Sequence, residues 1–262
     1  MTKVKDIISA IEKVAPRQLQ EDYDNAGYQV GNPEDEVTKV ISTLDVTEAT
    51  VDRAIAQGAQ LIVSHHPLLF RPIRRITPAD YISRTVIKAI QHGITIYSAH
   101  TNLDNAYMGV NYRIAEKLAM KDVRPLATLS AEKTSGIDHA ERFGSGVIGQ
   151  LCQPCHATEL ISIIRETFTS NCLRTNLSTL GHPDRLIKTI ALCGGSGADF
   201  IREAERQKAD AYLTGEIGYH NFFGHDGILL IEAGHFETEQ YTRDLLRDII
   251  VEAHPNITVN ID

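Results

Sequence analysis

The chain has 262 residues, which is enough for one large domain or two smaller ones with a proper core. Its 26 basic and 34 acidic residues give a formal net charge of −8, so nucleic acid is not an expected partner. No apolar run approaches the roughly 18 residues of a membrane span. Residues 1–16 have no secretory apolar core or cleavage site, so we expect a cytoplasmic protein with no membrane contact.

The first half of the chain alternates between strand and helix patterns. A β-branched run ends in Asp45, and a helical pattern with a glycine stop and a short apolar run follow it. This order predicts a βαβ unit and therefore a parallel sheet. The expected elements are a strand at 37–47, a helix at 48–58, a strand at 59–64, a helix at 81–93, a strand at 94–100 and a helix at 110–120.

The second half begins the same pattern again after a mixed, polar stretch. We interpret residues 121–145 as a connection between two lobes. The ranges 1–125 and 126–262 are then the expected lobes, unless they intertwine as one domain. The expected elements are strands at 145–151, 186–193, 210–216 and 227–235, and helices at 156–168, 198–209 and 236–254.

The two halves resemble each other at two linked places. The segment GITIYSAHTNLD (93–104) matches GILLIEAGHFETE (227–239) once a single glycine is inserted. Upstream, AIAQGAQLIVSHHPLLF (54–70) occupies the place that ERQKADAYLTGEIGYHNFF (205–223) has in the second half. This weak duplication predicts two similar α/β lobes, with mainly parallel sheets, that face one another across a shared site.

Potential metal ligands follow three of the expected strands. Parallel sheets bind ligands at the carboxyl ends of their strands, so these side chains are expected on one edge. Histidine with carboxylate suits zinc, iron or manganese. The candidates are His65 and His66 after the first strand, His100 and Asp104 after the second, and His235, Glu237 and Glu239 after the last.

The adjacent pair His65 and His66 favours a site with two metals. Consecutive side chains of an extended chain point to opposite sides, so each histidine would bind its own ion. Two ions about 3.5–4 Å apart and bridged by a carboxylate would use the pair. Pro67 would hold His66 extended. The alternative is that these are ordinary hydrogen-bonded histidines at strand ends.

Two further stretches have both a functional and a structural interpretation. The loop after the histidine pair contains three arginines, Arg71, Arg74 and Arg75. They could bind phosphate, since arginine forks suit phosphate oxygens, or they could simply lie on a solvated loop. The turn CGGSG (193–197) could present N–H groups to an anion, although a structural tight turn is the favoured interpretation.

Cys152 and Cys155 form a C-x-x-C pair. A zinc site would need further ligands such as His156 and Cys172, and a redox motif would need a strand-to-helix junction. We favour incidental, reduced cysteines.

The sequence resembles the GTP cyclohydrolase 1 type 2-like family, also called the NGG1-interacting-factor-like family. Six blocks run in family order along nearly the whole chain, and together they are highly specific. One departure is Tyr23, where the family usually has tryptophan. The blocks are DYDNAGYQVG (22–31), SHHPLLF (64–70), SAHTNLDNAYMGVN (98–111), ALCGGSG (191–197), DAYLTGEIGYH (210–220) and EAGHFETE (232–239).

The resemblance implies two similar α/β lobes around a central dinuclear site for two divalent metal ions. It places His100 in or just outside the ligand shell and makes Glu239 the bridge. It also implies ring-shaped homohexamers with the sites facing an internal cavity. The implied ligands are His65, His66, Asp104, His235 and Glu239.

The expected function is a metal-dependent hydrolase of a nucleotide or related phosphorylated small molecule. The family name implies GTP as substrate, and His100 or Glu237 would shuttle the proton. The alternative is a non-enzymatic protein that stores, delivers or senses a divalent metal with the same ligands.

Overall fold

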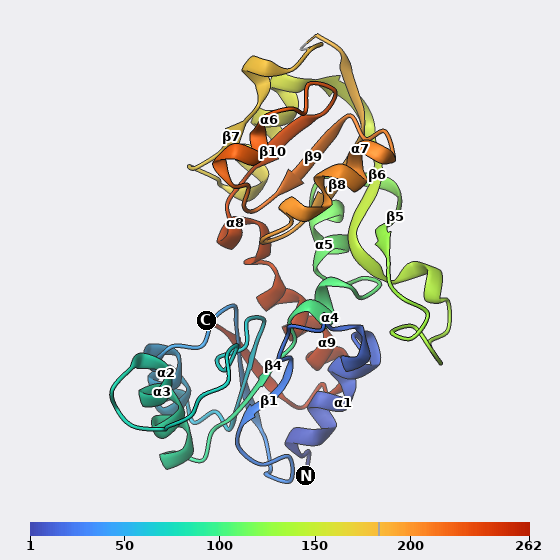
Figure 1. The fold of residues 1–262 in the computed structure, drawn as a ribbon. Coiled ribbons are helices and arrows are strands. Elements are labelled where there is room, and N and C mark those ends of the chain that lie inside the picture. Colours follow the sequence, from blue (N-terminus) through green and yellow to red (C-terminus); the bar gives the residue numbers. More distant parts are fainter. Residues whose placement is uncertain (183) are drawn as a thin grey trace. The chain divides into compact units, whose positions relative to one another are not determined.

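The computed structural model describes residues 1–182 and 184–262, which fold into two compact α/β units (Figure 1). Unit 1 contains residues 1–106 and 241–262, and unit 2 contains residues 107–240. The α/β class expected from the sequence is confirmed. The first boundary lies at 106/107 and not at the expected 125/126, and the last helix and strand of the chain return to unit 1.

Unit 1 is built on a sheet with the strand order β1-β4-β3-β2-β11. The strands from β4 to β11 are parallel, and β1 joins β4 antiparallel. The strands are β1 (Gly27–Val30), β2 (Lys39–Thr43), β3 (Leu61–Ser64), β4 (Thr95–Ser98) and β11 (Thr258–Ile261). The helices are α1 (Val4–Val14), α2 (Glu48–Gln57), α3 (Tyr81–Gln91), α4 (Thr101–Asp104) and α9 (Thr242–Ala253).

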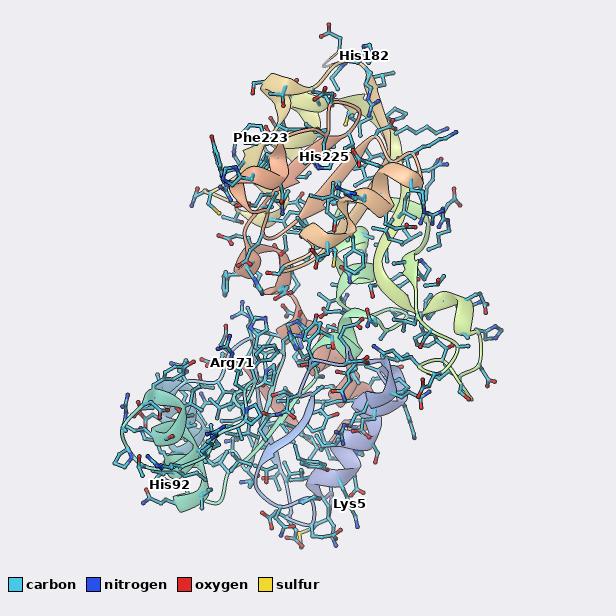
Figure 2. All side chains as sticks on the ribbon, in the orientation of Figure 1. Lys5, Arg71, His92, His182, Phe223 and His225 are labelled. Carbon is cyan, nitrogen blue, oxygen red and sulfur yellow. The ribbon has the colours of Figure 1, made fainter. Side chains whose placement is uncertain are left out.

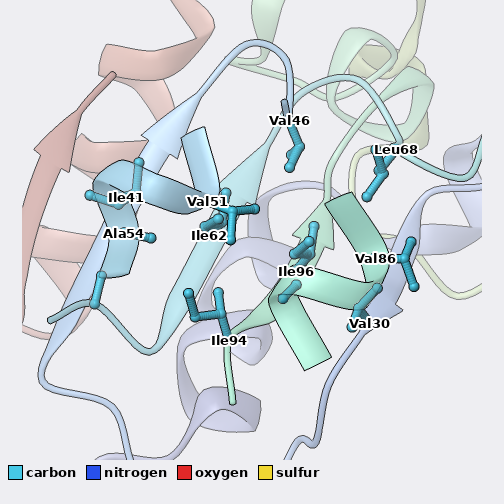
Figure 3. Packing of buried hydrophobic residues seen from close by; sticks show 12 residues of the cluster. Val30, Ile41, Val46, Val51, Ala54, Ile62, Leu68, Val86, Ile94 and Ile96 are labelled. Carbon is cyan, nitrogen blue, oxygen red and sulfur yellow. The ribbon is translucent and has the colours of Figure 1, made fainter. Parts of the chain in front are cut away.

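Helices α2 and α3 cover one face of this sheet, where Ile41, Ile62 and Ile96 of three neighbouring strands pack against them (Figure 3). The opposite face carries α1 and α9, and the buried Tyr97 donates a hydrogen bond from its hydroxyl to Glu12 of α1. Residues that follow one another in each strand thus alternate between two covered faces, which explains the continuous apolar runs in the sequence.

Unit 2 is built on a mixed sheet with the order β5-β6-β8-β9-β10-β7. The central strands β8, β9 and β10 are parallel, and the outer pairings are antiparallel. The strands are β5 (Met120–Thr128), β6 (Gly144–His156), β7 (Arg174–Thr175), β8 (Leu186–Cys193), β9 (Ala211–Thr214) and β10 (Leu229–Glu232). The helices are α5 (Val110–Lys117), α6 (Ala157–Phe168), α7 (Ile201–Arg206) and α8 (His235–Glu239).

Two of the expected elements are wrong. Residues 121–145 are not only a connection, because β5 lies within unit 2 as an edge strand beside β6. Its charged residues and Pro125 suit an edge, where one side of the strand needs no ladder partner, and they hide the strand pattern. The expected closing helix at 236–254 is divided into α8, which belongs to unit 2, and α9, which belongs to unit 1.

No helix in the described ranges 1–182 and 184–262 combines the length and the apolar character that a membrane span requires.

Candidate metal centre

The carboxyl ends of three parallel strands lie in register in unit 1. Thr43 of β2 pairs with Ser64 of β3, and Ser64 pairs with Ser98 of β4. The residues just beyond these positions therefore meet at one edge of the sheet. They are Asp45 after β2, His65 and His66 after β3, and His100 after β4.

Three histidine side chains come together at this edge. One ring nitrogen from each of His65, His66 and His100 lies within 4.8 Å of the other two. The expectation that His65 and His66 point to opposite sides is wrong, because both lie in a bend after β3 ends at Ser64. Their ring centroids are only 4.9 Å apart. The pair thus faces one common space.

The three histidine rings are oriented through their Nδ1 atoms. Each Nδ1 lies on an acceptor outside the cluster, which favours the tautomer with the proton on Nδ1 and the lone pair on Nε2. These contacts are His65 to the Ala99 carbonyl oxygen at 2.8 Å, His66 to Asp45 at 2.8 Å and His100 to Asp24 at 2.7 Å. The Nε2 atoms are therefore the ones available as metal ligands.

Asp24 is the most deeply placed carboxylate of this group. Its side chain is fully buried and also accepts a hydrogen bond from the backbone N–H of Thr101 at 3.0 Å. Burial by itself raises the pKa of Asp24, but the bonds from His100 and Thr101 outweigh burial and hold the pKa below its ordinary value. Asp24 is therefore a stable anion that faces His100.

Asp104, at the end of α4, adds a carboxylate to the cluster. Its Oδ1 lies 3.6 Å from the Nε2 of His65. Unit 1 thus gathers four of the predicted site residues: His65, His66, His100 and Asp104. Nitrogen and carboxylate oxygen donors in this arrangement fit a divalent ion such as zinc, iron or manganese.

Unit 2 contains a second group of possible metal ligands, at the carboxyl ends of its own parallel strands. His235 opens α8, and its Nε2 lies 3.0 Å from Oε2 of Glu239, one helical turn later. The Nδ1 of His235 lies 3.1 Å from Glu216, which follows β9. Hydrogen bonds from Ser196 and His235 lower the pKa of Glu216. His235 therefore has the same orientation device as the histidines of unit 1.

The glycine turn at 194–197 makes room for this second group. A Cβ atom on Gly195 would lie 2.1 Å from Oε1 of Glu239 and 3.2 Å from Nε2 of His235. The turn is also fixed to α8, because the Gly195 N–H donates to the Thr238 hydroxyl at 3.1 Å. The N–H groups of Gly194 and Gly197 donate to side chains as well, which supports the structural interpretation of this turn.

Glu237 lies apart from the His235–Glu239 pair within α8. It is two residues from each of them, and this spacing places it on a different side of the helix. Its carboxylate approaches Cys172, with an Oε1–Sγ distance of 3.9 Å. The structure therefore does not bring Glu237 to the predicted ligands of unit 2.

Arg71, Arg74 and Arg75 lie on the exposed loop that follows the histidine pair, and Figure 2 shows Arg71 on the upper side of unit 1. No residue in the described ranges forms an ion pair with them. They are thus exposed cations on the segment that follows His66, accessible to an anionic ligand.

The two cysteines of the C-x-x-C pair have different surroundings. Cys152 is exposed and its thiol lies 2.9 Å from the Ala119 carbonyl oxygen, whereas Cys155 is buried, which raises its pKa. Neither belongs to the possible metal-binding groups of the described residues. The interpretation as incidental, reduced cysteines stays a prediction.

Sequence reasoning missed the outer partners of the histidines: Asp24, Asp45 and Glu216. Two of them carried a signal. Asp45 ends the predicted first strand, and Glu216 takes the place of His66 when the two halves are aligned. Asp24 lies in an irregular segment, and only the fold brings it to His100.

A model of the family described as Duf34/NIF3 (NGG1p interacting factor 3) matches residues 2–262. A Lactococcus lactis protein named GTP cyclohydrolase 1 type 2 homolog is 37% identical over 247 residues, covering 92% of this chain and 89% of the relative. A Clostridium acetobutylicum protein of the same name is 35% identical over 239 residues, covering 90% and 85%.

Solved structures share the fold. The crystal structure of Staphylococcus aureus SA1388 is similar with a TM-score of 0.86 and 26% identity, over 99% of this chain and 96% of that one. Reduced HcgD from Methanocaldococcus jannaschii has a TM-score of 0.79 and 26% identity, over 99% and 97%. The match along the whole chain and the likeness of the fold agree with the resemblance drawn from the six sequence blocks, and the chain belongs to the Duf34/NIF3 family.

Proposed function

We propose that this protein is a dinuclear metal-dependent hydrolase that acts on a nucleotide or a related phosphorylated small molecule. The observation that carries the proposal is the cluster of His65, His66 and His100, in which one ring nitrogen of each histidine lies within 4.8 Å of the other two and every Nδ1 has a partner outside the cluster. In the proposed site, the ligands are His65, His66 and Asp104 of unit 1, with His235 and Glu239 of unit 2.

His100 is the group we assign to proton transfer. A bound pair of divalent ions would supply Lewis acidity, which polarises a substrate oxygen and makes a water acidic near neutral pH. The Nε2 of His100 accepts the proton of the attacking water. Asp24, an anion at the Nδ1 of His100, stabilises the imidazolium that forms and holds the ring in place. His100 is favoured over Glu237, because the carboxylate of Glu237 faces Cys172.

The substrate proposal rests on charge and on the names of relatives. Arg71, Arg74 and Arg75 would bind phosphate oxygens beside the histidine cluster, since arginine forks suit phosphate. Relatives at 35% and 37% identity are named GTP cyclohydrolase 1 type 2 homologs, so GTP is the first substrate to test. The ring-shaped hexamer and the cytoplasmic location implied earlier also remain proposals.

Metal analysis tests the site directly. Metal-free protein is titrated separately with zinc, iron(II) and manganese, and the bound metal is counted by mass spectrometry. We expect two ions per chain for the unsubstituted protein and fewer for His66→Ala and for Glu239→Ala. His92→Ala is the matched control, because His92 is exposed at the C-terminal end of α3, and Figure 2 shows it at the lower left of unit 1, away from Arg71.

Turnover measurements distinguish a hydrolase from a non-enzymatic metal-binding protein. The loaded protein is incubated with GTP, with other nucleotides and with simple phosphoesters, and His100→Ala is run beside it. We expect hydrolysis that His100→Ala lowers by about 10²–10⁴-fold, the usual range for a lost acid–base group. Full metal loading with no turnover of any compound would instead favour the non-enzymatic metal-binding protein.

A further inference from the structure

Two exposed aromatic side chains stand beside the histidine cluster of unit 1. Tyr23 is 69% exposed and Phe70 is 42% exposed. Their rings meet edge to face, with centroids 6.4 Å apart and an interplanar angle of 68°. Phe70 in turn meets His100 edge to face, with centroids 6.1 Å apart. Aromatic rings that remain in water next to a polar site are typical of ligand contact.

The two segments that carry these rings are fastened together. Asn25 Nδ2 donates to the Leu69 carbonyl oxygen at 2.7 Å, and the Leu69 N–H donates to Gln29 Oε1 at 3.0 Å. Both backbone groups of the residue before Phe70 are therefore held by the segment that follows Tyr23. The backbone next to both rings is thus held before any ligand arrives, which lowers the entropic cost of binding.

The same segments are attached to the histidine cluster. Asp24, the neighbour of Tyr23, bonds to His100 and to the N–H of Thr101. Phe70 lies four residues after His66 and directly before Arg71. The aromatic pair thus contacts the histidine cluster through Phe70 and His100, and the cationic loop begins at the next residue, Arg71.

We propose that Tyr23 and Phe70 form the binding platform for the planar heteroaromatic base of the substrate, while the loop of Arg71, Arg74 and Arg75 holds its phosphates. This proposal rests on the proposed function and narrows it. The substrate is a phosphorylated compound that carries a base, and not a sugar phosphate or a simple phosphomonoester. A base stacks on one ring and contacts the other through its edge, which suits any flat π-system.

Binding of two probes tests the platform. Guanosine 5′-monophosphate carries base and phosphate, and ribose 5-phosphate carries the phosphate and sugar alone. Calorimetry on the metal-loaded full chain should show tighter binding of the nucleotide. Tyr23→Leu and Phe70→Leu should each weaken nucleotide binding about tenfold, as expected when one base–aromatic contact is lost. They should leave the binding of ribose 5-phosphate unchanged.

A conservative variant gives an independent measurement. The chain has no tryptophan, so Tyr23→Trp introduces the single indole fluorophore. It keeps a π-face at the same place, so nucleotide affinity should persist and the fluorescence should be quenched by the nucleotide but not by ribose 5-phosphate. Ile90→Ala is the control, because Ile90 is 58% exposed and lies near the C-terminal end of α3. It should bind both probes as the unsubstituted protein does.

The platform proposal would be overturned if the unsubstituted protein bound the two probes with equal affinity. It would also be overturned if Tyr23→Leu lost the binding of both probes. Exposed rings that serve instead as a contact for another protein would give the first of these results. Failure of the proposed function looks different: base-dependent binding to the metal-loaded chain would persist while turnover is absent. The aromatic variants are surface changes, so unchanged thermal unfolding should accompany each of them.

Discussion

Oδ1 of Asp45 lies 2.8 Å from Nδ1 of His66. Asp45 follows the strand next to the one that His66 follows, so the parallel register itself delivers the partner. Unit 2 repeats the relationship between Glu216 and His235, at 3.1 Å, again across neighbouring parallel strands. In each unit, a carboxylate after the end of one strand thus orients the ring of a histidine that follows the neighbouring strand.

Asp45→Asn should weaken metal binding. The carboxylate makes the imidazole of His66 a better donor and holds its orientation, and loss of such an outer partner typically costs 10–100-fold in affinity. We expect a decrease of that size, measured by competition with a chromophoric chelator. Asp52→Asn is a matched control, since the Asp52 and Asp45 side chains are both 60% exposed and Asp52 pairs only with Lys88 among its charged contacts in the described residues. Equal affinities for the two variants would contradict the role of Asp45.

Gly195→Ala should displace the candidate metal ligands of unit 2, His235 and Glu239. The added Cβ would lie 2.1 Å from Glu239, and the backbone φ of +59° strains any other residue. Gly93→Ala is the control for strain alone, because its φ is +63° and its Cβ would meet nothing within 4 Å. Chemical denaturation should show a larger loss of stability for Gly195→Ala, with weaker metal binding only in that variant. The same loss in both variants would mean that space at Gly195 does not matter.

Stability at alkaline pH should depend on Tyr112. Burial raises its pKa to about 12, and its hydroxyl donates to the Arg142 carbonyl oxygen at 3.0 Å. A phenol whose pKa is higher in the folded state than its unfolded value of about 10 contributes stability below pH ~10 and loses it as the pH rises toward 12. Tyr112→Phe should therefore lose stability less steeply across that window in urea denaturation. If the free energy of unfolding fell equally steeply with pH in both proteins, the raised pKa of Tyr112 would be contradicted.

Glu232→Ala should destabilise unit 2. Glu232 is 8% exposed, pairs with Arg174 and accepts the Ile217 N–H at 2.7 Å. Removing its carboxylate leaves a buried N–H without an acceptor, which costs about 1–3 kcal/mol. The comparison is Glu203→Ala, which removes a surface pair with Arg206 and should change the free energy of unfolding by less than about 1 kcal/mol. Thermal or denaturant unfolding measures both, and equal losses would argue against a tertiary role for Glu232.

The duplicated pattern has a structural counterpart in each unit. In unit 1, β4 leads into α4, with His100 before the helix and Asp104 at its end. In unit 2, β10 leads into α8, with His235 at its start and Glu239 at its end. The inserted glycine of the sequence alignment, Gly234, has a φ of +97° and sits at the turn into α8. The same strand-to-helix junction thus presents a histidine and a carboxylate twice.

The hydrophobic pattern of the sequence and the residues at the predicted strand ends were enough to predict the parallel strands and the histidine cluster. Continuous apolar runs separated by helices with glycine stops predict buried parallel strands, because both faces of such a sheet are covered. Parallel strands end at a common edge, so the sequence alone indicated that His65, His66 and His100 would gather. That inference needed only local patterns and one rule of topology.

Only the tertiary structure decided the pairings that join distant segments. The return of 241–262 to unit 1 depends on β11 pairing with β2, and the strand character of β5 depends on its place beside β6. The contact of Asp24 with His100 joins residues 76 positions apart, with no periodic signal at Asp24. Local sequence encodes the conformation of each segment, whereas the partner of a side chain is set by packing among segments, which no single segment contains.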